Sequence, residues 1–180
     1  MSRKKPALRL VTQRSRNNAK RRLVPALPSM DARRALADSA QYGLYSKHKH
    51  NPGAYRLAPY AGLDTERTYC DAHASFGKES LHRIRPLMIR GIMLGLWSEQ
   101  YSGDVPSLLW TVDDSGWIFE LRVTNVGQAQ YHGYPVLAGD AFARQVLARV
   151  RDVFGMDGQY PMDQDPNIHV AVNAAERFYR

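Results

Sequence analysis

The sequence predicts an α+β fold in which a small antiparallel sheet, formed by a β-hairpin and a third strand, packs against two or three helices. Two apolar runs flank a turn in residues 107–124, which is typical of a hairpin. Residues 77–97 and 140–153 carry apolar side chains at helical spacing. The chain of 180 residues is 44% hydrophobic, which is enough to form the core of one domain with extensions.

The positive charge is concentrated at the start of the chain. Residues 1–22 contain nine Lys or Arg and no Asp or Glu, whereas the remaining residues carry 16 of the 25 basic side chains and all 17 acidic ones, a net charge of −1. Such an arm binds phosphates with release of counterions, so nucleic acid, RNA rather than DNA, is the expected partner; a solubilising tail is the alternative. The residues of the arm expected to bind nucleic acid are Arg3, Lys4, Lys5, Arg14, Arg16, Lys20, Arg21 and Arg22.

The arm is expected to be disordered over residues 1–28, and the α+β domain to cover residues 29–155. Ser29 can cap the first helix, which should run to about Gln41. A long loop over residues 44–76 follows, without a helical or strand period. Its aromatic side chains and those beside it predict that it is ordered and packed; they are Tyr42, Tyr45, Tyr55, Tyr60, Tyr69 and Phe76.

The next segment, Gly77 to Trp97, reads as helical. Pro86 lacks a backbone N–H, so it should kink this segment or split it in two. The apolar stripe of the segment consists of Leu81, Ile84, Met88, Ile92 and Leu96.

The hairpin is expected to pair Ser107–Val112 with Trp117–Thr124. Pairing Val112 with Trp117 would place Trp110 opposite Phe119. The core face would then consist of Leu108, Trp110, Val112, Trp117, Phe119, Leu121 and Val123. The less apolar face would consist of Ser107, Leu109, Thr111, Ile118, Glu120, Arg122 and Thr124.

A third strand is expected over Gln130–Val136. Asp140 can then cap a helix that runs to about Val153 and ends at Gly155. Its inner stripe would consist of Phe142, Val146 and Val150. Residues 156–180 are expected to form a C-terminal extension with a short helix near Asn173–Tyr179.

One group of side chains fits metal-free RNA cleavage. That reaction needs a base for the 2′-hydroxyl, an acid for the 5′-leaving oxygen and a cation for the charge that develops on phosphorus. His132 or Glu120 could be the base, and His48 or Tyr131 the acid. Arg122 could stabilise the charge, and Lys49 could contact phosphate. The plain alternative for Glu120 and Arg122 is a surface ion pair between them.

No metal and no cofactor are expected. A zinc site from His48, His50, Cys70 and His73 is an alternative, but Lys49 between the first two would repel the cation. The single cysteine cannot form an intramolecular disulfide, which favours a reducing, cytoplasmic location; an organelle transit peptide is the alternative for the Arg-rich start. No apolar run is long enough to span a membrane, so no membrane partner is expected.

The order of these motifs resembles a family of small uncharacterised bacterial proteins that share an HK…CD…W…ExR…YHGYP pattern. The matching positions are His48-Lys49, Pro52, Cys70-Asp71, Trp110, Glu120, Arg122 and Tyr131-His132-Gly133-Tyr134-Pro135, within residues 44–136. The chain departs from the pattern at Tyr45-Ser46, where the family has Gly-Ser. The layout is also similar to the barnase–EndoU–colicin–RelE type RNase toxins, which cleave RNA without a metal.

These observations lead to three hypotheses. The first is an RNA-directed protein that acts as a metal-independent endoribonuclease of toxin type. The second is a non-catalytic nucleic-acid-binding or ribonucleoprotein subunit. The third is a protein-interaction module of phage type, with a partner such as an inhibitor bound at an exposed patch around Leu109 and Ile118.

Overall fold

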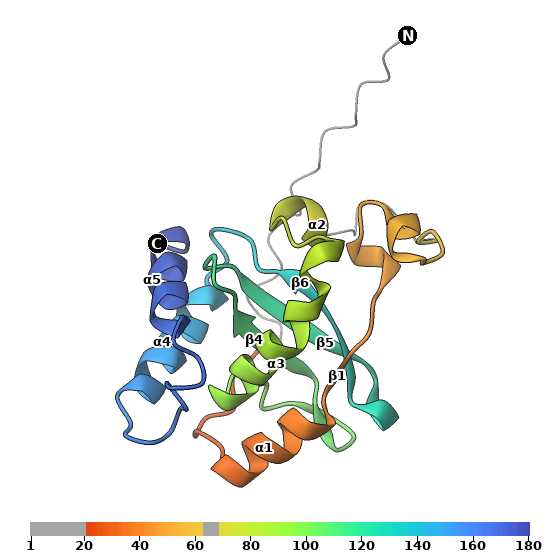
Figure 1. Cartoon of the computed structure of the whole chain (residues 1–180). Helices are drawn as coiled ribbons and strands as arrows, with labels where there is room; N and C mark the ends of the chain where they lie inside the picture. Colours follow the sequence, from red (N-terminus) through yellow and green to blue (C-terminus); the bar gives the residue numbers. More distant parts are fainter. Residues whose placement is uncertain (1–20, 63–68) are drawn as a thin grey trace.

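The computed structural model describes residues 21–62 and 69–180, and this part of the chain has the predicted α+β fold (Figure 1). The helices are α1 (Met30–Ser39), α2 (Cys70–His73), α3 (Ile84–Met93), α4 (Phe142–Phe154) and α5 (Ile168–Phe178), with short 3-10 helices over Ser46–His48, Pro52–Tyr55, Lys78–Arg83 and Val126–Gln128. The strands are β1 (Gln41–Tyr42), β2 (Tyr101–Ser102), β3 (Val105–Pro106), β4 (Leu108–Val112), β5 (Ile118–Asn125) and β6 (Gln130–Pro135).

The central sheet is mixed and has the strand order β1-β6-β5-β4. Strand β5 pairs with β4 and with β6 in antiparallel orientation, as predicted, whereas β1 pairs with β6 in parallel. Helices α1 and α3 cover one face of the sheet, and α4 and α5 cover the other (Figure 1). Every residue of β4 is therefore buried, whichever face it points to.

The predicted register of the hairpin is wrong by one residue. Val112 pairs with Ile118 rather than with Trp117, and Trp110 lies opposite Glu120. The turn is longer than expected because the Asp113 carboxylate accepts hydrogen bonds from the backbone N–H groups of Ser115 and Trp117, at 3.0 and 2.8 Å. A shift of one residue moves side chains to the opposite face, so Glu120 and Trp110 share a face.

The expected exposed face of the hairpin is also wrong. Leu109 is 1% exposed and Ile118 is 0% exposed, because helices pack on both sides of the sheet. A partner patch around these two residues is therefore ruled out in this fold.

The helices begin at or close to the predicted capping residues. The Ser29 hydroxyl accepts from the N–H of Ala32 and caps α1 as predicted. Asp140 was the predicted cap of α4, but Ala141 is the N-cap residue; the Asp140 carboxylate accepts from the N–H of Phe142, the first residue of the helix. Helix α1 ends at Ser39, earlier than expected, because Gln41 and Tyr42 pair with β6. Pro86 lies in the first turn of α3, so the predicted helical segment is split into a 3-10 helix and α3.

The C-terminal residues contribute to the core rather than lying outside it. Helix α5 begins earlier than the predicted terminal helix and packs against α4. Its buried side chains are Ile168, Ala171, Val172 and Ala175, which share one apolar cluster with Trp110 and Val146.

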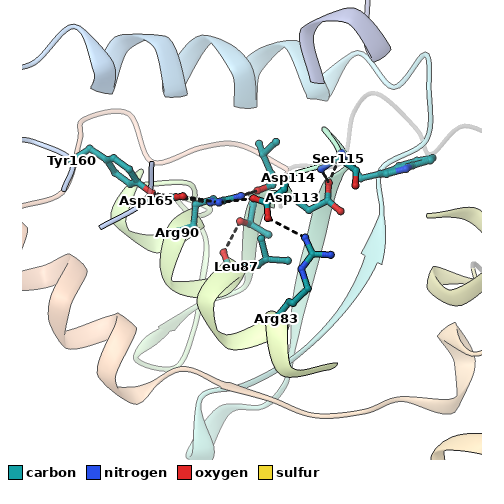
Figure 2. A network of polar contacts seen from close by, with 11 residues as sticks. Arg83, Leu87, Arg90, Asp113, Asp114, Ser115, Tyr160 and Asp165 are labelled. Carbon is teal, nitrogen blue, oxygen red and sulfur yellow. Dashed lines mark hydrogen bonds and ion pairs between the residues drawn. The ribbon is translucent and has the colours of Figure 1, made fainter. Parts of the chain in front are cut away.

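A polar network fastens α3 to the hairpin turn and to the segment before α5 (Figure 2). Arg90, which is 9% exposed, donates to both carboxylate oxygens of Asp165 at 2.7 Å. It also donates to Asp114 at 2.8 Å and to the carbonyl of Val112 at 2.7 Å. The Tyr160 hydroxyl donates to Asp165 at 2.6 Å, so one guanidinium joins three segments of the chain.

The expected disorder of residues 1–28 is wrong for residues 21–28. The N–H of Val24 donates to the carbonyl of Trp97 at 2.9 Å, and Arg149 donates to the Val24 carbonyl at 2.7 Å. Residues 1–20 lie outside the described residues. Within the described residues, no helix has the length and apolar character that a membrane span requires.

Candidate functional site

The structure brings His48 and His132 together. Their rings stack at a centroid distance of 5.0 Å and an interplanar angle of 16°. His132 lies on β6, and His48 ends the 3-10 helix of Ser46–His48. The parallel pairing of β1 with β6 continues to Gly43, whose N–H donates to the Tyr131 carbonyl at 2.7 Å, and this leads the following loop back over β6.

Tyr134 and Glu120 extend this cluster beneath the two histidines. The Tyr134 ring lies 5.0 Å from the His48 ring, and its hydroxyl donates to one carboxylate oxygen of Glu120. The other carboxylate oxygen accepts from the indole N–H of Trp110 at 3.1 Å. Glu120 is 0% exposed, so the predicted placement on a less apolar surface is wrong. A buried carboxylate in this position can orient the Tyr134 hydroxyl, but it is not exposed to contact a substrate.

Arg21 completes the polar centre. Its Nε lies 2.8 Å from Glu120 Oε2, and its terminal nitrogens donate to Asp140 at 2.8 and 3.3 Å. The guanidinium also lies 4.9 Å from the ring centroid of Phe142. Burial by itself would lower the pKa of Arg21, but Glu120 and Asp140 outweigh it and raise the pKa above its usual value. The prediction that Arg21 binds phosphate is wrong, because its side chain is buried between two carboxylates.

Tyr131 does not join the site, although it was a candidate acid. Successive residues of a strand point to opposite faces, and the Tyr131 hydroxyl donates to the carbonyl of Pro106 at 2.8 Å, on the face opposite to His132. Burial raises the pKa of Tyr131, so it stays a protonated donor. Tyr134, to which the sequence analysis assigned no role, lies in the site where Tyr131 was expected. Residues 132 and 134 of a strand point to the same face, and this alternation could have identified Tyr134 from the sequence.

Arg122 lies on the same face of the sheet as Glu120 and His132. It is half-buried and directly opposite His132 in the pairing of β5 with β6. This register makes Arg122 the neighbour of His132 across the two strands, and the carboxylate of Glu120 contacts Arg21.

Lys49 and Cys70 lie below the surface. Lys49 is 1% exposed, and its ammonium lies 4.8 Å from the ring centroid of Tyr55. The prediction that Lys49 contacts phosphate is therefore wrong. Lys49 and Cys70 line a cavity of about 40 Å³, and the Cys70 thiol donates to the Gly133 carbonyl at 3.1 Å. Burial raises the pKa of Cys70 to about 12, against the opposing effect of Lys49, so the group is a thiol and not a nucleophile.

The other predicted residues lie apart from this centre. His50 is exposed, and its backbone N–H donates to both carboxylate oxygens of Asp71, at 3.0 and 3.1 Å. Arg22 is an exposed residue 3.6 Å from Glu99. Among the residues that the structure describes, no group of three His, Cys, Asp or Glu side chains is placed to hold a metal ion. The arm residues Arg3, Lys4, Lys5, Arg14, Arg16 and Lys20 lie outside the described residues.

No family model, curated protein or solved structure matches this chain. The resemblance to the bacterial HK…YHGYP family and the similarity to RNase toxins therefore stay predictions. The structure brings together His48, His132, Tyr134, Glu120 and Arg21 in one cluster. We call this cluster the histidine site and base the proposed function on it.

Proposed function

We propose that this chain is an RNA-directed protein that cleaves RNA without a metal ion at the histidine site. The proposal depends on the stacking of the His48 and His132 rings, whose centroids lie 5.0 Å apart although the two residues are far apart in the sequence. Imidazole is the side chain that can accept and donate a proton near neutral pH. Two such groups side by side can serve as base and acid in one transphosphorylation.

In the proposed reaction, one imidazole removes the proton of a ribose 2′-hydroxyl, and the 2′-oxygen attacks the adjacent phosphorus. The bond from phosphorus to the 5′-oxygen breaks, and the imidazolium of the other histidine protonates that oxygen. The products are a 2′,3′-cyclic phosphate and a 5′-hydroxyl, with no net proton change. In this proposal Arg122, the cross-strand neighbour of His132, stabilises the charge that develops on the phosphoryl oxygens.

Tyr134, Glu120 and Arg21 have positioning roles in this proposal. Tyr134 packs against His48 while its hydroxyl is held by Glu120, which fixes the ring on which His48 rests. Arg21 and Trp110 hold the carboxylate of Glu120 in turn. Rigid support of this kind keeps reacting groups within the narrow geometry that acid–base catalysis needs.

The test is incubation of the purified protein with RNA in excess EDTA. We expect cleavage that leaves 2′,3′-cyclic phosphate ends and that falls by about 10²- to 10⁴-fold in each of His48→Ala and His132→Ala. His82→Ala, at an exposed position of the Lys78–Arg83 helix, is the matched control and should cleave like the unmodified protein. Cleavage that persists in both site variants, or none by the unmodified protein, would overturn the proposal.

A second candidate function is non-catalytic binding of nucleic acid. It is favoured by the seven basic and no acidic side chains of residues 1–20, and by the burial of both imidazoles, which are 3% and 7% exposed. This candidate predicts binding that weakens steeply with salt while the RNA stays intact. The same EDTA incubation, analysed for both binding and cleavage, distinguishes the two.

A further inference from the structure

Tyr45 is an exposed aromatic residue placed directly on the histidine site. It is 39% exposed, although it lies in the middle of a contact cluster. Its ring centroid is 4.8 Å from that of His132 and 5.8 Å from that of His48. Tyr45 therefore contacts both imidazoles on one side and solvent on the other. A substrate that approaches the two histidines from solvent would meet Tyr45.

A second aromatic residue and a cation lie beside Tyr45. The Tyr60 ring meets the Tyr45 ring at 6.2 Å and 84°, so the two rings form a corner. The ammonium of Lys47 lies 5.7 Å from the centroid of Tyr60. Aromatic rings next to a cation are the common means by which proteins bind unpaired nucleobases and the phosphates attached to them.

We propose that Tyr45 and Tyr60 form a base-stacking subsite, and that its ligand is an unpaired nucleobase of single-stranded RNA. The inference rests on the proposed function, because it names the form of RNA that the histidine site receives. A base in a duplex is already stacked and cannot insert beside Tyr45, whereas every unpaired base offers a ring face. The subsite therefore selects single strands without selecting a sequence, and Lys47 lies where the backbone phosphate of the stacked nucleotide would pass.

The experiment measures binding separately from cleavage. The probe is a short single-stranded oligonucleotide with 2′-O-methyl groups, which lacks the nucleophilic hydroxyl, and the readout is fluorescence anisotropy. Tyr45→Ala should weaken binding by about 5- to 150-fold, the range that corresponds to the loss of one stacked base. Tyr45→Phe keeps the ring and should bind within about twofold of the unmodified protein. Tyr101→Ala, at a tyrosine that is 50% exposed on β2, is the matched control and should have no effect.

An oligonucleotide with abasic sites gives the decisive comparison. It keeps the phosphates, so its affinity should be low and nearly equal for Tyr45→Ala and the unmodified protein. The inference is overturned if Tyr45→Ala binds the intact oligonucleotide as the unmodified protein does, or if Tyr101→Ala loses as much affinity. It is also overturned if a duplex binds as tightly as the single strand and depends equally on Tyr45.

Failure here and failure of the proposed function give different results. Cleavage that depends on His48 and His132, with binding indifferent to Tyr45, removes the subsite and leaves the ribonuclease. Binding that depends on Tyr45, without any cleavage, removes the reaction and retains the subsite. Thermal unfolding of each variant, compared with Tyr45→Phe, separates lost contacts with RNA from a lost fold.

Discussion

The guanidinium of Arg21 lies 2.8 Å from the carboxylate of Glu120, and both side chains are buried, at 7% and 0% exposure. A pair of this kind is costly to break, since removal of one partner leaves the other charge without compensation in a low-dielectric environment. Arg21→Met should therefore destabilise the fold by about 3–5 kcal/mol. The free energy of unfolding in urea measures this loss.

The control for Arg21 is its neighbour in the sequence. Arg22 is 71% exposed and lies 3.6 Å from the partly exposed Glu99, so Arg22→Met should change the free energy of unfolding by less than about 1 kcal/mol. The combination of Arg21→Met with Glu120→Gln should be less destabilised than the sum of the two single variants, because the fully buried carboxylate of Glu120 is then not left without its partner. Strict additivity would contradict the coupling.

A second prediction concerns acid stability and the network around Arg90. Burial by itself would raise the pKa of Asp165, but hydrogen bonds from Arg90 and Tyr160 outweigh it, so the pKa lies below its usual value. A carboxylate with a lowered pKa in the folded state stabilises the protein above the ordinary pKa of Asp, about 3.9, and this contribution is lost as the pH falls through the folded-state value.

Asp165→Asn should therefore be less stable than the unmodified protein at pH 7, and the difference should shrink as the pH falls below the ordinary pKa of Asp, about 3.9. Urea unfolding at several pH values measures both. Asp163→Asn, at an exposed position two residues away, is the control. A difference that is constant with pH would show that the charge of Asp165 contributes nothing to stability.

A third prediction separates the two tyrosines of β6. Tyr134→Phe removes the hydroxyl that donates to Glu120, so it should lower RNA cleavage by about tenfold or more if Tyr134 positions His48. Tyr131→Phe removes the hydrogen bond to Pro106 on the other face, so it should cost about 1–3 kcal/mol of stability while cleavage by the folded protein is retained. Cleavage that falls more in Tyr131→Phe than in Tyr134→Phe would contradict this assignment.

Local signals in the sequence were sufficient for elements whose ends are set by one side chain. The predicted cap at Ser29 marked the start of α1, the predicted cap at Asp140 lies two residues before the start of α4, and the predicted third strand ends one residue after β6. The register of the hairpin could not be obtained in this way. It depends on the two hydrogen bonds that Asp113 accepts within the turn, and a four-residue spacing of polar side chains does not reveal them.

The site was predictable only as a set of residues, not as an arrangement. His48, His132 and Glu120 were chosen from residue type and order, and the structure places them in one cluster. The burial of Glu120 depends on its contact with Arg21, which lies near the start of the chain. A local sequence pattern cannot predict a contact between residues so far apart in the sequence. The two faces of the sheet are likewise buried by helices from both ends of the chain, which a period of two in β4 and β5 could not show.

The last prediction concerns the charge of the arm. Residues 1–20 hold seven basic side chains and no acidic one, so neutralising them should remove most of the electrostatic part of RNA binding while Arg21 keeps its buried ion pairs. For single strands, the logarithm of the binding constant falls with the logarithm of salt concentration by about 0.7 per contacted phosphate, so seven contacts account for a slope of at most about 5. Replacement of all seven by Gln should reduce the measured slope by up to that amount, whereas Arg144→Gln with Arg177→Gln, on exposed positions of α4 and α5, should change it little. Equal slopes for the neutralised and unmodified arms would mean that the arm does not contact phosphate, and binding would then depend on the domain alone.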